Sequence, residues 1–142
     1  MAIVFIGKAQ PAGRALTCEP GRILVVDDDH ASQMLATVIL ELEGYHVDVA
    51  ASSIQAARLI AEHRPDLILM DVQLPGEDGL SFTRRLRADP LTASIPIVAV
   101  TALAMKGDLE RTIAAGCDAY VVKPLDTKTF ASDLRKLLRI AV

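Results

Sequence analysis

Polar side chains that could carry chemistry occur directly after short apolar segments at four places in the chain. Asp27, Asp28 and Asp29 follow residues 23–26, Asp71 follows 67–70, Thr101 follows 97–100, and Lys123 follows 119–122. Carboxylates that meet at one place repel each other, so such a site raises their pKa values or recruits a cation. Oxygen ligands without His or Cys suit a hard ion such as magnesium, which typically joins carboxylates to a phosphate.

Two of these residues complement the acids. Lys123 supplies a positive charge and Thr101 a hydroxyl donor, and both suit the oxygens of a phosphoryl group. The chemistry that this set of side chains fits is phosphoryl transfer to or from a carboxylate, with magnesium as the cofactor.

The apolar segments before these residues are predicted strands in a repeated strand and helix pattern. Strands are predicted at 23–26, 46–50, 67–70, 97–100 and 119–122. Helices are predicted over 30–43, from Ser52 or Ser53 towards Pro65, from about Leu80 to before Asp89, from about Met105 to Gly116, and from Asp126 or Thr127 to the end.

Five strand and helix pairs in strict alternation predict an α/β fold. Parallel neighbours need crossover connections, so we expect a five-stranded, doubly wound parallel sheet with helices on both faces. Ligands of such sheets bind beyond the carboxyl ends of the strands. The residues that follow the strands should therefore gather at one edge.

Composition limits the class of protein. The chain has 142 residues, 51% of them hydrophobic, and a formal net charge of −3. These values predict one soluble domain, and the charge gives no basic surface for nucleic acid or an anionic membrane. No apolar run reaches the roughly twenty residues of a membrane-spanning helix. We expect a cytoplasmic protein without a targeting signal, in which Cys18 and Cys117 are free thiols.

The first 21 residues lack the alternating strand and helix pattern of the rest of the chain. Gly7, Pro11, Gly13, Pro20 and Gly21 interrupt any periodic pattern there. We expect residues 1–21 to form an irregular or partly disordered extension, and a short strand followed by a linker is an open alternative. The domain proper is then expected over 22–142.

Four motifs, in order, carry a resemblance to a known family. Residues 23–29 (ILVVDDD), 69–79 (LMDVQLPGEDG), 100–102 (VTA) and 120–124 (YVVKP) resemble the receiver domain of two-component response regulators. Residues 102–108 (ALAMKGD) are similar to single-domain receivers of the DivK type, and also to receivers of hybrid kinases. The resemblance implies a CheY-like fold with strand order 2-1-3-4-5.

The resemblance also implies roles for the site residues. Asp71 would accept a phosphoryl group from a phosphohistidine on a sensor histidine kinase or a histidine phosphotransfer protein. Asp28, Asp71 and the backbone carbonyl of Gln73 would bind magnesium, and Asp27 would do so directly or through water. Lys123 would pair with Asp71 before the transfer and with the phosphate after it.

Two further residues would form the switch. Thr101 would move to bond the new phosphoryl oxygen, and Tyr120 would turn inward into the space that Thr101 leaves. The change would alter the surface formed by the fourth helix, the fifth strand and the fifth helix, which would control a downstream protein target. Phosphorylation-dependent homodimerisation is an open expectation. Gln73 and Leu103 are expected to set the rate at which the acyl phosphate hydrolyses.

Several charged residues have simpler interpretations. Asp29 is favoured as a helix N-cap over membership of the acidic site, and Asp78 as a cap or turn residue. Arg84, Arg85 and Arg87 are expected on the solvated face of the third helix.

The leading hypothesis is a stand-alone signalling switch rather than an enzyme, because few residues follow Leu138. The enzyme alternative is a magnesium-dependent phosphatase with an aspartyl nucleophile, for which Asp27 and Asp29 have the right spacing. A receiver excised from a hybrid histidine kinase, and a degenerate receiver that only binds proteins, are the remaining alternatives.

Overall fold

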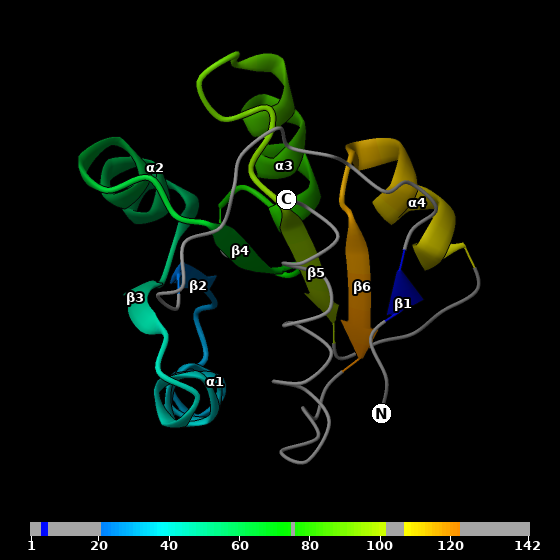
Figure 1. The fold of residues 1–142 in the computed structure, drawn as a ribbon. Coiled ribbons are helices and arrows are strands. Elements are labelled where there is room, and N and C mark those ends of the chain that lie inside the picture. The colour runs from blue at the N-terminus through cyan, green and yellow to red at the C-terminus, as the bar shows by residue number, and fades with distance from the viewer. Residues whose placement is uncertain (1–3, 6–20, 75, 102–106, 123–142) are drawn as a thin grey trace.

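The computed structural model describes residues 4–5, 21–74, 76–101 and 107–122, and Figure 1 shows their arrangement. The described strands are β1 (Val4–Phe5), β2 (Arg22–Val26), β3 (His46–Ala50), β4 (Leu67–Asp71), β5 (Ile97–Thr101) and β6 (Ala119–Val122). The described helices are α1 (His30–Leu42), α2 (Ser53–Glu62), α3 (Gly79–Ala88) and α4 (Asp108–Ala115). The helix predicted from Asp126 or Thr127 lies outside the described residues. No described helix has the length and apolar character needed to span a membrane.

The strands form one sheet in the order β1-β6-β5-β4-β2-β3. Strands β2 to β6 pair in parallel, so the order of the five parallel strands along the sheet is 2-1-3-4-5, as predicted. Strand β1 adds a short antiparallel partner to β6, with Val4 opposite Tyr120 and Phe5 opposite Ala119. The N-terminal extension thus contributes a strand, which was one of the alternatives that the sequence left open.

The register of the sheet brings the ends of the parallel strands to one edge. Val26 at the end of β2 lies opposite Met70, and Asp71 at the end of β4 lies opposite Val100. Backbone hydrogen bonds continue just past these ends, since the Asp27 N–H donates to the Ala50 carbonyl at 2.9 Å. The polar residues that follow β2 and β4 are therefore held next to one another.

Both faces of the sheet are buried. Side chains alternate between two apolar clusters, so that Ile23 and Val25 pack on the face covered by α1, while Leu24 and Val26 pack on the face covered by the other helices. Figure 1 shows α1 below the sheet, with α2, α3 and α4 above it. Every residue of β4 and β5 is buried, which explains why their sequences are continuously apolar rather than alternating.

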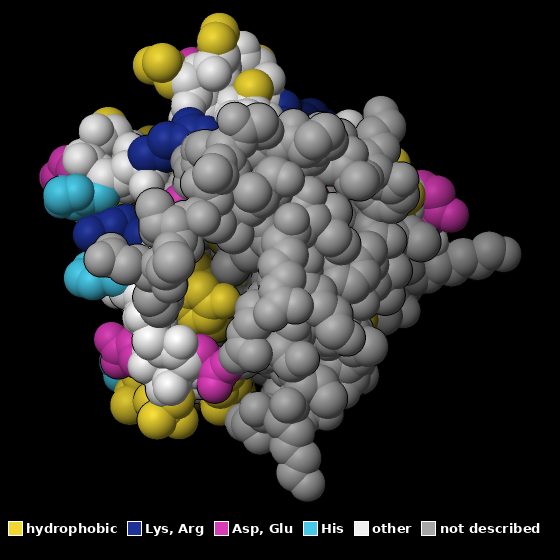
Figure 2. All heavy atoms as spheres, in the orientation of Figure 1, with side chains coloured by type: hydrophobic (Ala, Val, Ile, Leu, Met, Phe, Trp, Pro, Cys, Tyr) yellow, Lys and Arg dark blue, Asp and Glu magenta, His cyan; other side chains and the backbone are white. Residues whose placement is uncertain are grey.

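Helix α1 has two apolar stripes, of which only one faces the sheet. Its buried residues are Ala36, Ile39 and Leu40. Met34, Val38 and Leu42, spaced four residues apart, are 54%, 52% and 80% exposed. Figure 2 shows apolar side chains on the surface where α1 lies, at the lower left of the view.

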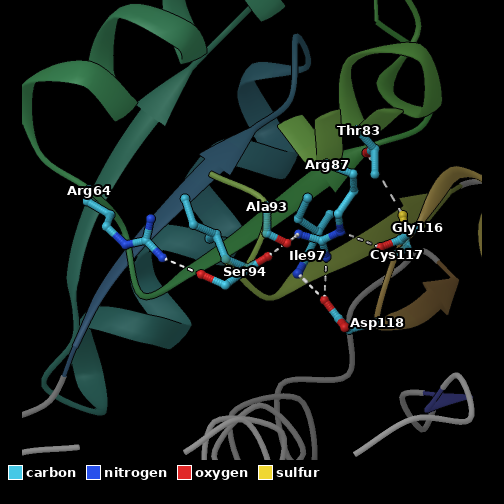
Figure 3. Close-up of polar contacts among 10 residues, drawn as sticks. Arg64, Thr83, Arg87, Ala93, Ser94, Ile97, Gly116, Cys117 and Asp118 are labelled. Carbon is cyan, nitrogen blue, oxygen red and sulfur yellow. Dashed lines mark hydrogen bonds and ion pairs between the residues drawn. The ribbon is translucent and has the colours of Figure 1, made fainter. Parts of the chain in front are cut away.

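The arginine run on α3 was only partly interpreted correctly. Arg84 and Arg85 are exposed, as expected. The prediction was wrong for Arg87, whose guanidinium contacts Asp118 at 2.7 Å and donates to the carbonyls of Gly116, Ala93 and Ile95 at 2.8, 2.9 and 2.6 Å (Figure 3). Loop carbonyls without a helix or strand partner need donors, and Arg87 supplies them.

Candidate functional site

Three carboxylates meet at the edge formed by β2 and β4. Asp27 and Asp28 directly follow β2, Asp71 ends β4, and the two strands are paired neighbours. One carboxylate oxygen from each residue lies within 4.8 Å of the other two. Asp27 and Asp71 are buried, at 5% and 6% exposure, whereas Asp28 is exposed to solvent. The cluster therefore opens to water on the Asp28 side.

Local backbone hydrogen bonds orient the two buried carboxylates. The Asp27 carboxylate accepts from the Asp29 N–H at 2.9 Å, and the Asp71 carboxylate accepts from the Gln73 N–H at 3.0 Å. The side-chain amide of Gln33, on α1, donates to the backbone carbonyl of Asp27. Such bonds from an aspartate to the backbone two residues on fix the chain as it leaves a strand.

The donor set fits a hard divalent cation. All three ligand atoms are carboxylate oxygens, the type that magnesium prefers. Asp27, Asp28 and Asp71 would each supply one such oxygen to the cation. The cation would offset the repulsion between two buried carboxylates, which is costly when uncompensated.

The Asp29 carboxylate caps a helix and is not one of the three carboxylates of the cluster. It is the N-cap of α1, and its carboxylate accepts from the N–H and the hydroxyl of Ser32 at 2.9 and 2.8 Å. Asp78 is likewise the N-cap of α3 and accepts from the Ser81 N–H at 2.8 Å. Both residues therefore act as the helix caps that the sequence favoured.

The other predicted site residues differ in their position on the sheet and in their exposure. Thr101 ends β5 at the same edge of the sheet and is 3% exposed. Gln73 is exposed and follows β4 by two residues. Tyr120 lies on β6, is 7% exposed, and packs in the apolar cluster on the face that α2, α3 and α4 cover. Lys123 and Leu103 lie outside the described residues.

The sequence interpretation missed one residue near the site. Glu77, six residues after Asp71, forms an ion pair with Arg85 on α3 at 2.8 Å. Arg85 is the largest cause that holds the pKa of Glu77 below its usual range. The acid and the base are eight residues apart, on a loop and a helix, so no helical or strand period relates them.

Comparisons with known proteins point to one family. The family model described as response regulator receiver domain matches residues 23–135. The polar-differentiation response regulator DivK of Brucella anthropi is 40% identical over 119 residues, which is 84% of this chain and 97% of that protein. DivK of Brucella ovis is 40% identical over 116 residues, covering 82% and 94% of the two chains.

Solved structures agree with the sequence comparisons. A putative response regulator from Chloroflexus aurantiacus superposes with a TM-score of 0.81 at 32% identity, covering 85% of this chain and 99% of that one. The receiver domain of a sensor histidine kinase from Pseudomonas aeruginosa has a TM-score of 0.74 at 38% identity, covering 86% and 98%. That structure has a magnesium ion coordinated in its active-site cleft.

Proposed function

This chain belongs to the response regulator receiver domain family, and we propose that it accepts a phosphoryl group on Asp71 from a phosphohistidine of a partner protein. The observation that carries the proposal is the convergence of the Asp27, Asp28 and Asp71 oxygens within 4.8 Å at the carboxyl edge of the sheet. Doubly wound sheets bind ligands at this edge, where the order of the strands reverses.

The same donor set supports a magnesium site. In the proposed site Asp28, Asp71 and the backbone carbonyl of Gln73 are ligands, and Asp27 binds directly or through water. When bound, magnesium neutralises charge between the carboxylates and the phosphoryl oxygens. The chain itself supplies the nucleophile, since Asp71 is buried and oriented by the Gln73 N–H.

In the proposed reaction a carboxylate oxygen of Asp71 attacks phosphorus. A bond forms between this oxygen and phosphorus while the bond between phosphorus and the histidine nitrogen breaks, and the electron pair returns to the imidazole. Lys123 pairs with the phosphoryl oxygens in this proposal. Water hydrolyses the product at a rate that depends on the residues beside it, for which Gln73 and Leu103 are our candidates.

The switch that we propose starts at Thr101. An acyl phosphate adds roughly two negative charges and acceptor oxygens, to which the Thr101 hydroxyl can donate. Thr101 would move towards the phosphoryl group, and Tyr120 would turn into the space left behind. The changed surface around α4 and β6 would then bind a downstream protein target or a second copy of the chain. The protein is in this view a signalling switch and not an enzyme with an external substrate.

The exposed stripe on α1 supports a helical protein as the phosphoryl donor. Helix α1 begins at His30, immediately after the acidic residues that follow β2, and its exposed Met34 and Val38 lie about one and two helical turns from that start. A partner that presents a phosphohistidine to Asp71 must contact this part of the surface. Apolar side chains at helical spacing suit packing against a helix of that partner.

Of the two alternatives, the phosphatase fits the structure less well than the receiver of a hybrid kinase. The phosphatase hypothesis needs Asp29 as a second acid beside Asp27, and Asp29 instead caps α1. A receiver from a hybrid histidine kinase remains a second candidate, because the P. aeruginosa relative is such a domain. We favour the stand-alone regulator because the match spans 97% of B. anthropi DivK. We place it in the cytoplasm, with which the free thiol of Cys117 agrees.

The test is incubation of the protein with acetyl phosphate and magnesium, followed by intact mass measurement. We expect one added phosphoryl group, lost in Asp71→Asn and retained in Asp29→Asn, since Asn is an equally good helix cap. Omission of magnesium should abolish the adduct. Repeated turnover of phosphate monoesters that survives Asp71→Asn would overturn the proposal.

A further inference from the structure

The loop between β4 and α3 carries Gln73, whose backbone carbonyl is a proposed metal ligand. The two ends of the loop are joined by a hydrogen bond of 2.9 Å from the Gly79 N–H to the Val72 carbonyl. Leu74 anchors the first half, because it is 9% exposed and packs in the apolar cluster against α2 and α3. The chain then turns at Gly76, where φ is +82°. The second half of the loop carries Glu77, whose side chain makes a contact of its own with α3.

Glu77 makes that contact. Its two carboxylate oxygens accept from the Arg85 guanidinium, with distances of 2.9 Å from Nε and 2.8 Å from one terminal nitrogen. The Arg85 guanidinium also lies over the ring of Phe82, 5.2 Å from its centroid. A two-pronged pair of this kind fixes direction as well as distance. Phe82 is 1% exposed, so the guanidinium rests on a fixed surface.

The residue after Glu77 fixes only the start of the helix. The Asp78 carboxylate accepts from the Ser81 N–H at 2.8 Å as the N-cap of α3. Glu77 reaches further along the same helix, to Arg85, and so ties the described residues 76–78 to the body of α3.

We infer that Glu77 is a positioning residue, which together with Arg85 holds the loop in the shape that presents the Gln73 carbonyl to magnesium. This inference rests on the proposed function. Groups that orient metal ligands without touching the metal typically change metal affinity by about 10-fold to 100-fold when they are removed. Glu77 acts through the backbone of the loop and is not itself a ligand.

The substitution Arg85→Ala distinguishes the positioning role of Glu77 from a purely electrostatic effect of its charge on the cation. If Glu77 acted only as a negative charge near the cation, Glu77→Ala would weaken magnesium binding and Arg85→Ala would strengthen it. If the two residues hold the loop, both substitutions weaken binding. The two explanations thus predict opposite signs for Arg85→Ala.

The experiment measures the magnesium dissociation constant of the full-length chain by isothermal titration calorimetry. We expect an increase of about tenfold in Glu77→Ala and in Arg85→Ala, with no further increase in the double variant. Glu62→Ala is the matched control, since Glu62 is an exposed acid at the end of α2, and it should match the wild type. Tighter or unchanged binding in Arg85→Ala would overturn the inference.

Two additions keep the result decisive. Glu77→Gln retains one acceptor oxygen for Arg85 and loses the other, so it should lie between the wild type and Glu77→Ala. It replaces Glu77→Ala if that variant does not fold. The magnesium concentration for half-maximal phosphorylation by acetyl phosphate should rise in parallel. A wild type that neither binds magnesium nor is phosphorylated would reject the proposed function, whereas a competent wild type with unaffected variants rejects only the role of Glu77.

Discussion

A Cβ atom on Gly79 would stand 2.0 Å from the backbone carbonyl oxygen of Asp71 and 2.9 Å from the carbonyl carbon. The first residue of α3 is thus in direct contact with the last residue of β4. Only a residue without a side chain fits there, because real Cβ atoms do not approach other atoms so closely. A shift of the start of α3 would consequently also shift Asp71.

Gly79→Ala should disturb both stability and reaction. The new methyl group must displace the backbone of Asp71 or the start of α3, which we expect to lower the free energy of unfolding by about 1–3 kcal/mol. A displacement of about 1 Å can slow a reaction by about a hundredfold, so phosphorylation by acetyl phosphate should slow by up to that factor. Urea unfolding and the rate of adduct formation measure the two effects.

Gly76→Ala is the control for this substitution. Gly76, unlike Gly79, has a positive φ, of +82°, and a Cβ atom there would meet nothing within 4 Å. Gly76→Ala should lower the free energy of unfolding by about 1–2 kcal/mol, the cost of placing a residue with a side chain in the left-handed region. The rate of phosphorylation at saturating magnesium should change little. Equal rates in the two variants would show that the contact between Gly79 and Asp71 does not matter for the reaction.

Arg87→Ala should be strongly destabilising. Arg87 joins α3 to the loops before β5 and β6, and the loss of its side chain leaves Asp118 and the carbonyl of Gly116 without these bonds. Breaking such a half-buried pair costs about 3 kcal/mol in unfolding free energy. Arg84→Ala, at an exposed position of the same helix, should change stability by less than about 0.5 kcal/mol. Similar urea midpoints for both variants would contradict this prediction.

Cys117 should make stability depend on pH above neutrality. Burial raises the pKa of its thiol to about 11, whereas an unfolded thiol titrates near about 8.5. Between these values the unfolded chain loses a proton that the folded chain keeps. Between these two pKa values the free energy of unfolding should therefore fall by up to about 1.4 kcal/mol per pH unit. Below the pKa of the unfolded thiol, Cys117 should not make stability depend on pH.

The measurement is a comparison of the wild type with Cys117→Ala by urea unfolding at several pH values from neutral upward. The variant lacks this titration, so the difference in unfolding free energy between the two proteins should shrink or change sign as the pH rises. Parallel pH profiles would show that Cys117 keeps an ordinary pKa in the folded state.

Val38→Asp should distinguish protein donors from small ones. Val38 is 52% exposed, so the substitution should leave the fold intact. A buried charge at the proposed helical interface should slow phosphotransfer from a cognate phosphohistidine protein by at least about tenfold. The rate with acetyl phosphate, which needs no such interface, should not change.

The control for the α1 surface is Ile54→Asp. Ile54 is 74% exposed on α2, which covers the other face of the sheet. It should leave transfer from the protein donor unchanged. An equal slowing by both substitutions would argue against a donor that docks on α1.

The strands and their ends were predictable from local sequence. A continuous apolar run that stops at a polar residue marks the end of a buried strand, and 119–122 was predicted from such a run with the observed bounds. The strand at 46–50 was predicted from its alternating pattern, also with the observed bounds. Parallel pairing then requires the strand ends to meet at one edge. The approach of Asp27, Asp28 and Asp71 follows from these two facts without knowledge of any side-chain contact.

Contacts between distant segments were not predictable in this way. Periodicity places Met34 and Ile39 on the same amphipathic helix but does not say which stripe the sheet will cover. Arg87 looked like an exposed residue because its partners Gly116 and Asp118 are 29 and 31 residues further along the chain. The pairing of Glu77 with Arg85 depends in the same way on how the loop after β4 folds back onto α3.

Strand β1 has a consequence for self-association. The edge strand of a sheet has unpaired backbone N–H and C=O groups with which another chain can pair, and this pairing is a common route to aggregation. Val4 and Phe5 occupy that position beside β6, opposite Tyr120 and Ala119. The N-terminal segment thus covers this side of β6 and leaves a strand of only two residues, β1, at the edge, which is a poor template for pairing with another chain. A chain shortened to begin at Arg22 would keep the acidic site but lose this protection, and would be more prone to aggregate when concentrated.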